Sequence, residues 1–242
     1  MKKLYEYDKD TRLFVREVYA QLNDVATERT GKEVYFVIPY TTETEPPSSV
    51  PQGYTVVYNL EEDNWTQIED HRGQNVYNVE LNEIVPYNQL GPIVGPYVAE
   101  YPDTDVLKYM RYDGTKFVLN REQILELIWE MRKTIRDSTC ASDLEYNGHM
   151  YHVDAVSLND IMLAAQEAIL SQDFTTTKRW VTADDINVLL TGTDFVAIMR
   201  LYGDRRQQLV YESNDAWQSD ITKTDDELIA VYRELNGGVA HE

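Results

Sequence analysis

The hydrophobic period of this 242-residue chain changes near residue 120, and that change limits what the chain can fold into. Before it, apolar side chains recur at alternate positions, as at Tyr5 and Tyr7. After Asn120 they recur three or four positions apart, as at Ile124 and Ile128. A period of two is typical of a strand with one buried face, and a period near 3.6 of an amphipathic helix. The sequence therefore predicts an α+β fold with a β-rich first part and a helix-dominated second part.

The first part predicts a small antiparallel β domain over residues 1–80. Its expected strands are Tyr5–Tyr7, Leu13–Val18, a buried apolar run at Val34–Ile38, and Tyr54–Tyr58. A further stretch, Asn64–Asn78, alternates apolar and polar side chains, breaks at Arg72-Gly73 and then resumes. This stretch predicts a hairpin or a strand–turn–strand, with Gly73 supplying the backbone freedom of a tight turn.

Residues 81–118 predict an arm followed by a short hairpin. Four prolines and two glycines fall in residues 86–102, so no helix or long strand can persist there. The apolar content of this segment favours an ordered arm that lies on another surface over a solvated linker. The hairpin is expected at Leu107–Val118, around the turn dipeptide Asp113-Gly114.

Residues 119–242 predict a helix-dominated α+β domain. Caps are expected at Asn120 with Gln123, at Ser157 with Asp160, and at Thr224 with Glu227. One long helix is expected over Phe195–Trp217. Hairpins are predicted at Asn147-Gly148 and over Trp180–Leu190.

Composition excludes several classes of protein. The formal net charge of −20 argues against binding to nucleic acid or to an anionic membrane surface, since both require a positive footprint. The single cysteine, Cys140, allows no intramolecular disulfide, which fits folding in a reducing cytoplasm. The N-terminus has no apolar run like that of a secretory signal, and no stretch approaches the ~18 apolar residues of a membrane span.

No pattern in the chain points to catalysis. The motifs G-x-S-x-G, H-E-x-x-H, G-x-x-x-x-G-K-[ST] and G-x-G-x-x-G are all missing from the sequence. His149 and His152 lie beside Asp154, but their spacing on a hairpin strand directs them to opposite faces, which disfavours a shared metal. Asp70 and Arg72 flank a turn, where such residues more often pair with each other. We therefore predict no catalytic residue, no cofactor and no metal site.

The eighteen tyrosines, against five phenylalanines, form the least usual part of the composition. Tyrosine is favoured at half-buried interfaces and is also a good strand residue, and the sequence alone leaves both interpretations open. On the first interpretation, the candidate interface residues are Tyr54, Tyr58, Trp65, Arg72, Tyr77, Tyr87 and Tyr97.

Two sets of residues resemble phage tail families. The first combines Y-x-Y-D-x-x-T-x-x-F from Tyr5, a Pro-Pro segment and W-x-x-x-x-D-x-R-G-x-x-x-Y-N from Trp65, and resembles the N-terminal region of tail-fibre and tail-fibre-assembly proteins. The second set covers about 130–235 and is similar to the DUF4376 type of domain found on phage tail-fibre-related proteins. Its residues are R-D-S from Arg136, Tyr146-x-Gly148-x-x-Tyr151-x-Val153-Asp154-x-x-Ser157, Ile161-x-x-Ala164-Ala165, Trp180-x-Thr182-Ala183-Asp184 and Leu190-Thr191. Asp185 stands where relatives commonly have Asn.

These resemblances imply a non-enzymatic phage tail protein of the fibre or baseplate, acting in host attachment through protein–protein contacts. It would be made in the host bacterial cytoplasm and end in the virion tail. Its partners would be fibre or baseplate proteins, with self-association as a trimer left open, and no nucleic acid or membrane. The main alternative is a tail-fibre assembly chaperone that is absent from the mature virion. An enzyme or a glycan-binding adhesin is a third and less favoured class.

Overall fold

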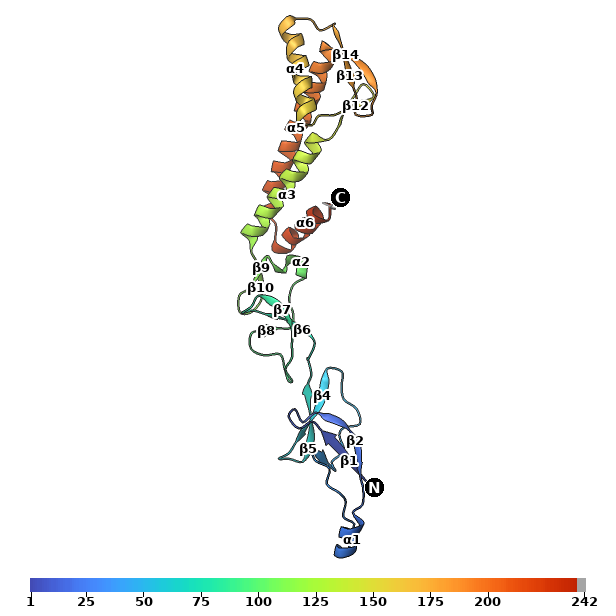
Figure 1. Ribbon diagram of the computed structural model, residues 1–242. Coiled ribbons are helices and arrows are strands. Elements are labelled where there is room, and N and C mark those ends of the chain that lie inside the picture. The colour runs from blue at the N-terminus through green and yellow to red at the C-terminus, as the bar shows by residue number, and fades with distance from the viewer. Residues whose placement is uncertain (239–242) are drawn as a thin grey trace. The chain divides into compact units, whose positions relative to one another are not determined.

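The computed structural model describes residues 1–238 and divides into two compact units, Met1–Asp103 (unit 1) and Thr104–Glu242 (unit 2). Unit 1 is built mostly from short antiparallel strands and unit 2 mostly from helices (Figure 1), which confirms the predicted α+β class. The short strands of the expected arm fall in unit 1, and the expected hairpin at 107–118 falls in unit 2. The last four residues of the expected C-terminal domain, 239–242, lie outside the described residues.

Unit 1 contains three small sheets and one short helix. Its elements are β1 (Lys2–Tyr7), β2 (Phe14–Ala20), α1 (Asp24–Thr30), β3 (Thr41–Thr42), β4 (Tyr54–Asn59), β5 (Asn64–Glu69), β6 (Asn75–Asn78), β7 (Glu83–Pro86) and β8 (Tyr97–Val98). The sheet orders are β2-β1-β3, β4-β5 and β7-β6-β8, and every pairing is antiparallel. The predicted strands at Tyr5–Tyr7, Leu13–Val18 and Tyr54–Tyr58 are confirmed.

The stretch Asn64–Asn78 is a strand–turn–strand and not a hairpin. Strand β5 pairs with β4, from Tyr54↔Glu69 to Asn59↔Asn64, while β6 pairs with β7 and β8. The break falls at Gly73, whose φ of 81° lies in the region that favours glycine. The turn therefore connects two different sheets, β4-β5 and β7-β6-β8.

The predicted buried strand at Val34–Ile38 is wrong. Only Tyr35 forms a bridge, to Leu22, while Val37 is 91% exposed and Phe36 54% exposed. The backbone of this segment bonds to the chain just before α1, because Phe36 N–H donates to the Gln21 carbonyl over 2.9 Å. A short apolar run has no periodicity of its own, so it carries no signal for whether a core covers it.

Unit 2 combines four longer helices with three hairpins. Its elements are α2 (Thr104–Leu107), β9 (Met110–Tyr112), β10 (Phe117–Leu119), α3 (Arg121–Ala141), β11 (Leu144–Tyr146), β12 (His149–Tyr151), α4 (Ala155–Ser171), β13 (Thr177–Val181), β14 (Asn187–Thr191), α5 (Gly192–Asp220) and α6 (Asp225–Gly238). The three predicted hairpins and the long helix are confirmed. Helices α3 and α5 run side by side in opposite directions, with α4 against α5 and α6 against α3 (Figure 1).

Helix caps follow the sequence signals with one exception. The Asn120 side chain accepts from Gln123 N–H, and Thr224 and Glu227 bond each other reciprocally, as predicted. Helix α4, however, is capped by Asp154, which accepts from the N–H groups of Val156 and Ser157. Ser157 supports this cap by donating its hydroxyl to Asp154 over 2.7 Å, so the predicted cap lies one turn too late.

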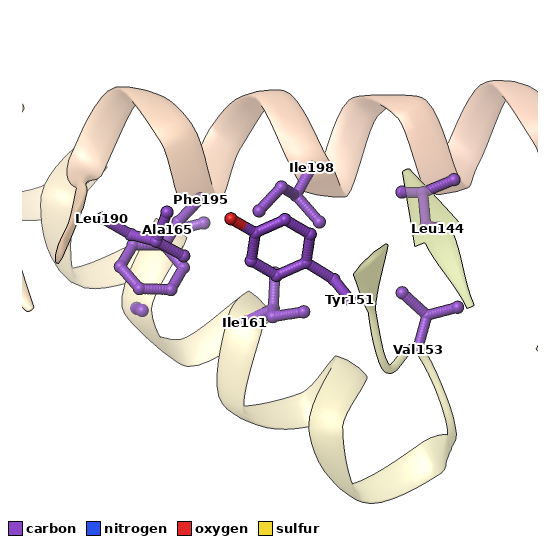
Figure 2. Close-up of a cluster of buried hydrophobic side chains, with 9 residues drawn as sticks. Leu144, Tyr151, Val153, Ile161, Ala165, Leu190, Phe195 and Ile198 are labelled. Carbon is purple, nitrogen blue, oxygen red and sulfur yellow. The ribbon is translucent and has the colours of Figure 1, made fainter. Parts of the chain in front are cut away.

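One hydrophobic core of unit 2 lies between α4, α5 and the β11–β12 and β13–β14 hairpins. Figure 2 shows Tyr151 between Ile161 of α4 and Ile198 of α5. A face of small residues on α4 is buried, including Ala165 at 0% exposure. Such small side chains allow α4 and α5 to approach closely. The approach is tightest at Gly192 of α5, where an added Cβ would lie 2.6 Å from the Cβ of Ala168.

A second core joins α3 and α6. It contains Ile124 and Ile128 of α3 with Leu228 and Tyr232 of α6, packed against residues from α2 and β10. Next to it, α5 ends at Asp220, a carboxylate with 0% exposure. Asp220 accepts hydrogen bonds from Arg132 and contacts Lys223 at 3.1 Å, so this buried charge is paired.

Candidate interaction surface

Trp65 and Tyr58 are part of an aromatic group inside unit 1. The Tyr58 ring stacks on Tyr7 with centroids 4.7 Å apart, and Trp65 lies 5.2 Å from Tyr58 and 5.7 Å from Phe14. The Trp65 indole N–H donates to the carbonyl of Thr44 over 2.8 Å. These contacts join strands β1, β4 and β5 and the loop after β3, so the group holds two sheets together.

Asp63 anchors this aromatic group from the β4–β5 turn. It accepts hydrogen bonds from Tyr58, from Thr42 at 3.1 Å and from Thr44 at 3.2 Å. Those bonds hold the pKa of the Asp63 carboxyl below its usual value. Burial and the bond to Asp63 raise the pKa of Tyr58, so the hydroxyl keeps its proton.

The turn between β5 and β6 is occupied by internal ion pairs. Arg72 donates to both oxygens of Asp70 over 2.8 and 2.7 Å, which lowers the pKa of Asp70. His71 lies between Glu69 at 2.9 Å and Gln74 at 3.0 Å, and the hydrogen bond to Glu69 raises its pKa. The prediction that Asp70 and Arg72 pair with each other is confirmed.

A second group of tyrosines belongs to the β6–β8 sheet. Tyr87 is 1% exposed and donates its hydroxyl to the Pro92 carbonyl over 2.9 Å, and its ring meets that of Tyr97 edge to face at 5.4 Å. Tyr77 is 4% exposed, with Tyr101 at 6.4 Å. The glycine- and proline-rich segment thus wraps this small core.

Burial separates the seven candidate interface residues. Tyr58, Tyr77 and Tyr87 are inside unit 1 and offer a partner almost no surface. Trp65 and Tyr97 are half-buried. Tyr54, at 44% exposure, and Arg72, whose side chain is 38% exposed, remain available for contact.

An exposed apolar surface that the sequence analysis missed lies around α1. We name residues 21–38 the helical loop. None of the residues of α1 is buried, and Val25, Phe36 and Val37 are 79%, 54% and 91% exposed. The loop is nevertheless ordered: Asn23 caps α1, and its backbone N–H donates to the Val34 carbonyl over 2.8 Å. The available signal was the lack of any apolar stripe on α1 that could pack onto a core.

The histidines and paired carboxylates of unit 2 have separate local roles. His152 lies 2.8 Å from Asp143, whereas the nearest carboxylate to His149 is Asp184 at 3.9 Å, beyond hydrogen-bonding distance.

Asp225 begins α6 and pairs with Arg121 at 2.6 Å, as expected of a residue at a helix start. Asp184 and Asp185 instead lie in the turn of the β13–β14 hairpin. Within residues 1–238, no cluster of three or more His, Cys, Asp or Glu side chains is arranged to hold a metal ion.

Residues 123–234 match the family described as "Domain of unknown function (DUF4376)", so this α+β chain carries a DUF4376 domain in unit 2. The DUF4376 resemblance predicted from the sequence is confirmed. No helix in the described part of the chain is long and apolar enough to cross a membrane.

The chain is similar to three curated proteins, two of which are named for tail-fibre assembly. The chain is 32% identical over 82 residues to the "Tail fiber assembly protein" of Escherichia phage lambda, which covers 34% of this chain and 40% of the relative. It is 30% identical over 82 residues to the "Prophage tail fiber assembly protein homolog TfaR" of Escherichia coli K12, covering 34% and 41%. It is 30% identical over 112 residues to "Protein TfaD" of the same strain, covering 45% and 56%. The chain thus spans between two fifths and somewhat more than half of these relatives, and no solved structure matches it.

Proposed function

We propose that this chain acts in the assembly of phage tail fibres, by binding a tail-fibre protein and without catalysis. The observation that carries the proposal is the 30–32% identity to relatives of which two are named for tail-fibre assembly. The DUF4376 domain also supports a role in phage tails, because this type of domain resembles those of phage tail-fibre-related proteins. The internal pairing of Asp70, His71 and Arg72 fits a scaffold better than a catalytic group.

The sequence resemblances alone favour a component of the finished tail over an assembly chaperone. The names of two relatives favour the assembly factor, which we therefore place first. We keep three weaker alternatives: a position in the virion tail, contact with the baseplate, and self-association as a trimer.

The helical loop supplies the contact surface in this proposal. Its helix packs on no core of its own chain, and three large apolar side chains stand open to solvent. Such surface is unfavourable in water and gains free energy when a partner covers it. Tyr54 extends the set of exposed aromatic positions in unit 1.

The first test is expression of the cognate tail-fibre protein with and without this chain. We expect the yield of soluble fibre, and its co-purification with this chain, to depend on the chain being present. Mass spectrometry of purified virions separates the two roles: absence from particles supports an assembly factor, and a fixed copy number supports a tail component. Normal fibre yield without the chain, together with no binding, would overturn the proposal.

The second test concerns the helical loop. Val37→Ser should weaken fibre binding, because Val37 is the most exposed of its apolar side chains. Leu81→Ser is the matched control, since Leu81 is 60% exposed in unit 1 but lies outside the loop. Equal binding by both variants would remove the helical loop from the contact surface.

A further inference from the structure

A groove of about 780 Å³ lies between α3, α4 and α5, inside the DUF4376 domain. Its walls include Arg136 and Cys140 from α3, Leu158 and Met162 from α4, and Tyr202 and Arg206 from α5. The Cys140 sulfur lies 3.6 Å from the Tyr202 hydroxyl, which joins two of the walls. This volume falls in the range of sites that take a drug-sized ligand or the side chains of a bound peptide.

The groove exposes apolar surface that the fold leaves uncovered. Met162 is 39% exposed and Val210 43% exposed, and both line the groove beside Leu158 and Val153. The core on the other side of α4 is complete, since Ile161 and Ala165 are fully buried. Helix α4 therefore has one apolar face in the core and part of another turned to the groove.

The groove is also basic in an acidic chain. Residues 132–141 of α3 and 200–210 of α5 carry six basic and two acidic side chains, although the whole chain has a net charge of −20. Most of these cations have internal partners: Arg132 pairs with Asp220, and Arg205 donates to the carbonyls of Cys140 and Ser142. Arg136 and Arg206 line the groove itself.

Arg206 is the cation best placed to meet a ligand. Arg206 is an exposed residue; within the groove it contacts the Tyr202 hydroxyl, which also meets Cys140, and its charge interacts with the Asp137 carboxylate, which lines the groove too. Arg136, on the opposite wall, pairs with Asp137 at 2.8 Å and is about one fifth exposed. A carboxylate at the mouth of the groove would meet both guanidinium groups, which bind carboxylates in defined planar geometries.

We propose that this groove binds an acidic, amphipathic segment of the tail-fibre protein. An apolar side chain of that segment contacts Leu158 and Met162, and a neighbouring carboxylate pairs with Arg206 and Arg136. This is recognition of an amphipathic segment in a helix-lined groove, with apolar anchors for affinity and charge for orientation. The inference rests on the proposed function, and it adds a second contact, in unit 2, to that of the helical loop in unit 1.

Charge reversal tests the electrostatic half of the proposal. The full chain is titrated with the purified cognate fibre protein, and binding is measured by calorimetry or by surface immobilisation. Arg206→Glu should weaken binding at least tenfold and reduce its salt dependence. Arg179→Glu, on exposed β13 and outside the groove, should change the affinity less than twofold.

A second pair of variants tests the apolar half. Met162→Gln should weaken binding at least fivefold, whereas Leu163→Gln, the next residue on α4 and 55% exposed outside the groove, should not. Thermal unfolding of all four variants verifies the fold. Arg206 and Met162, the two residues changed inside the groove, have solvent-accessible side chains, so we do not expect their variants to unfold.

Cys140 supplies an independent readout because it is the only cysteine and its side chain, 9% exposed, lies in the groove wall, so reagent reaches it only through the groove. Saturating fibre protein should slow its alkylation by iodoacetamide at least tenfold, and Arg206→Glu should remove that protection. Fibre binding that is unchanged in Arg206→Glu and Met162→Gln, with Cys140 still reactive, overturns the groove inference and leaves the proposed function standing. No fibre binding by the unchanged chain overturns both.

Discussion

Unit 1 and unit 2 bury different side chains. The buried residues of unit 1 include five tyrosines, Tyr5, Tyr7, Tyr58, Tyr77 and Tyr87. In unit 2 the two hydrophobic clusters are mostly aliphatic, as at Ile124, Ile161 and Ile198, each 0% exposed. Both units are built from antiparallel strands and helices, so the main difference between them is the type of side chain that each core buries.

A tyrosine core has a requirement that an aliphatic core lacks. Each buried hydroxyl needs an acceptor, because an unpaired buried polar group costs more than a hydrogen bond gains. In unit 1 Asp63 accepts from Tyr58 and the Pro92 carbonyl from Tyr87. Short strands that bury little aliphatic surface thus depend on specific polar contacts, while unit 2 depends on close packing of helices.

The largest predicted effect is at the ion pair of Arg132 with the buried Asp220 in unit 2, a polar contact within a mostly aliphatic interior. Arg132→Met leaves the fully buried Asp220 carboxylate with Lys223 alone, and should lower the free energy of unfolding of unit 2 by about 3 kcal/mol. Hydrogen exchange of peptides from α3 and α5 measures the loss. The double variant Arg132→Met/Asp220→Leu should recover most of it, and a loss below about 1 kcal/mol in the single variant would contradict the assigned role.

The second prediction tests the helix packing of unit 2 directly. Gly192→Ala places a Cβ 2.6 Å from that of Ala168 and 3.0 Å from the Phe174 backbone, and overpacking of this kind should cost about 2 kcal/mol. Gly203→Ala is the matched control in the same helix, because nothing lies within 4 Å of an added Cβ there. The control should instead stabilise unit 2 by about 0.5–1 kcal/mol through helix propensity. Loss of stability in both variants would show that α5 is sensitive at every glycine and not at the α4 contact.

The third prediction concerns the tyrosine hydroxyls of unit 1. Tyr87→Phe removes the hydrogen bond that the 1% exposed Tyr87 donates to the Pro92 carbonyl, so it should destabilise unit 1 by about 1 kcal/mol. Tyr54→Phe, at a 44% exposed position, should have almost no effect. Hydrogen exchange of β6–β8 peptides gives the measurement. Equal stability of the two variants would mean that the core of unit 1 depends on ring packing alone.

Local signals in the sequence predicted the turns and most caps, but not the pairing of strands. Asn147-Gly148 and Asn120 act through residues within a few positions, so a single segment carries the whole signal. Strand β5 pairs with β4 and not with β6, and its Trp65 contacts Tyr58 of β4 and Phe14 of β2. Those contacts join positions up to about fifty residues apart, and no period within one strand encodes them.

The candidate surface was only partly predictable for a related reason. Alternation assigned Tyr58 and Tyr77 to strands correctly, but a tyrosine on a strand gives the same sequence signal whether a sheet or a partner covers it. The groove in unit 2 combines side chains from three helices. Arg136 and Arg206 are seventy residues apart, so only the antiparallel packing of α3 on α5 brings them to one site.

The smallest predicted effect is a pH dependence in unit 1, small because Asp63 is exposed and solvent screens its charge. Hydrogen bonds from Tyr58, Thr42 and Thr44 lower the pKa of the Asp63 carboxyl in the folded chain. Between that lowered pKa and the ordinary value of about 3.9, the unfolded chain binds the proton and the folded chain does not, so stability falls as the pH falls. Asp63→Asn should flatten this part of the profile, measured by exchange of β4 and β5 peptides corrected for the intrinsic rate at each pH. Glu61→Gln removes a charge from the same turn without touching the aromatic group, and an identical flattening there would assign the effect to net charge and not to the bonds that Asp63 accepts.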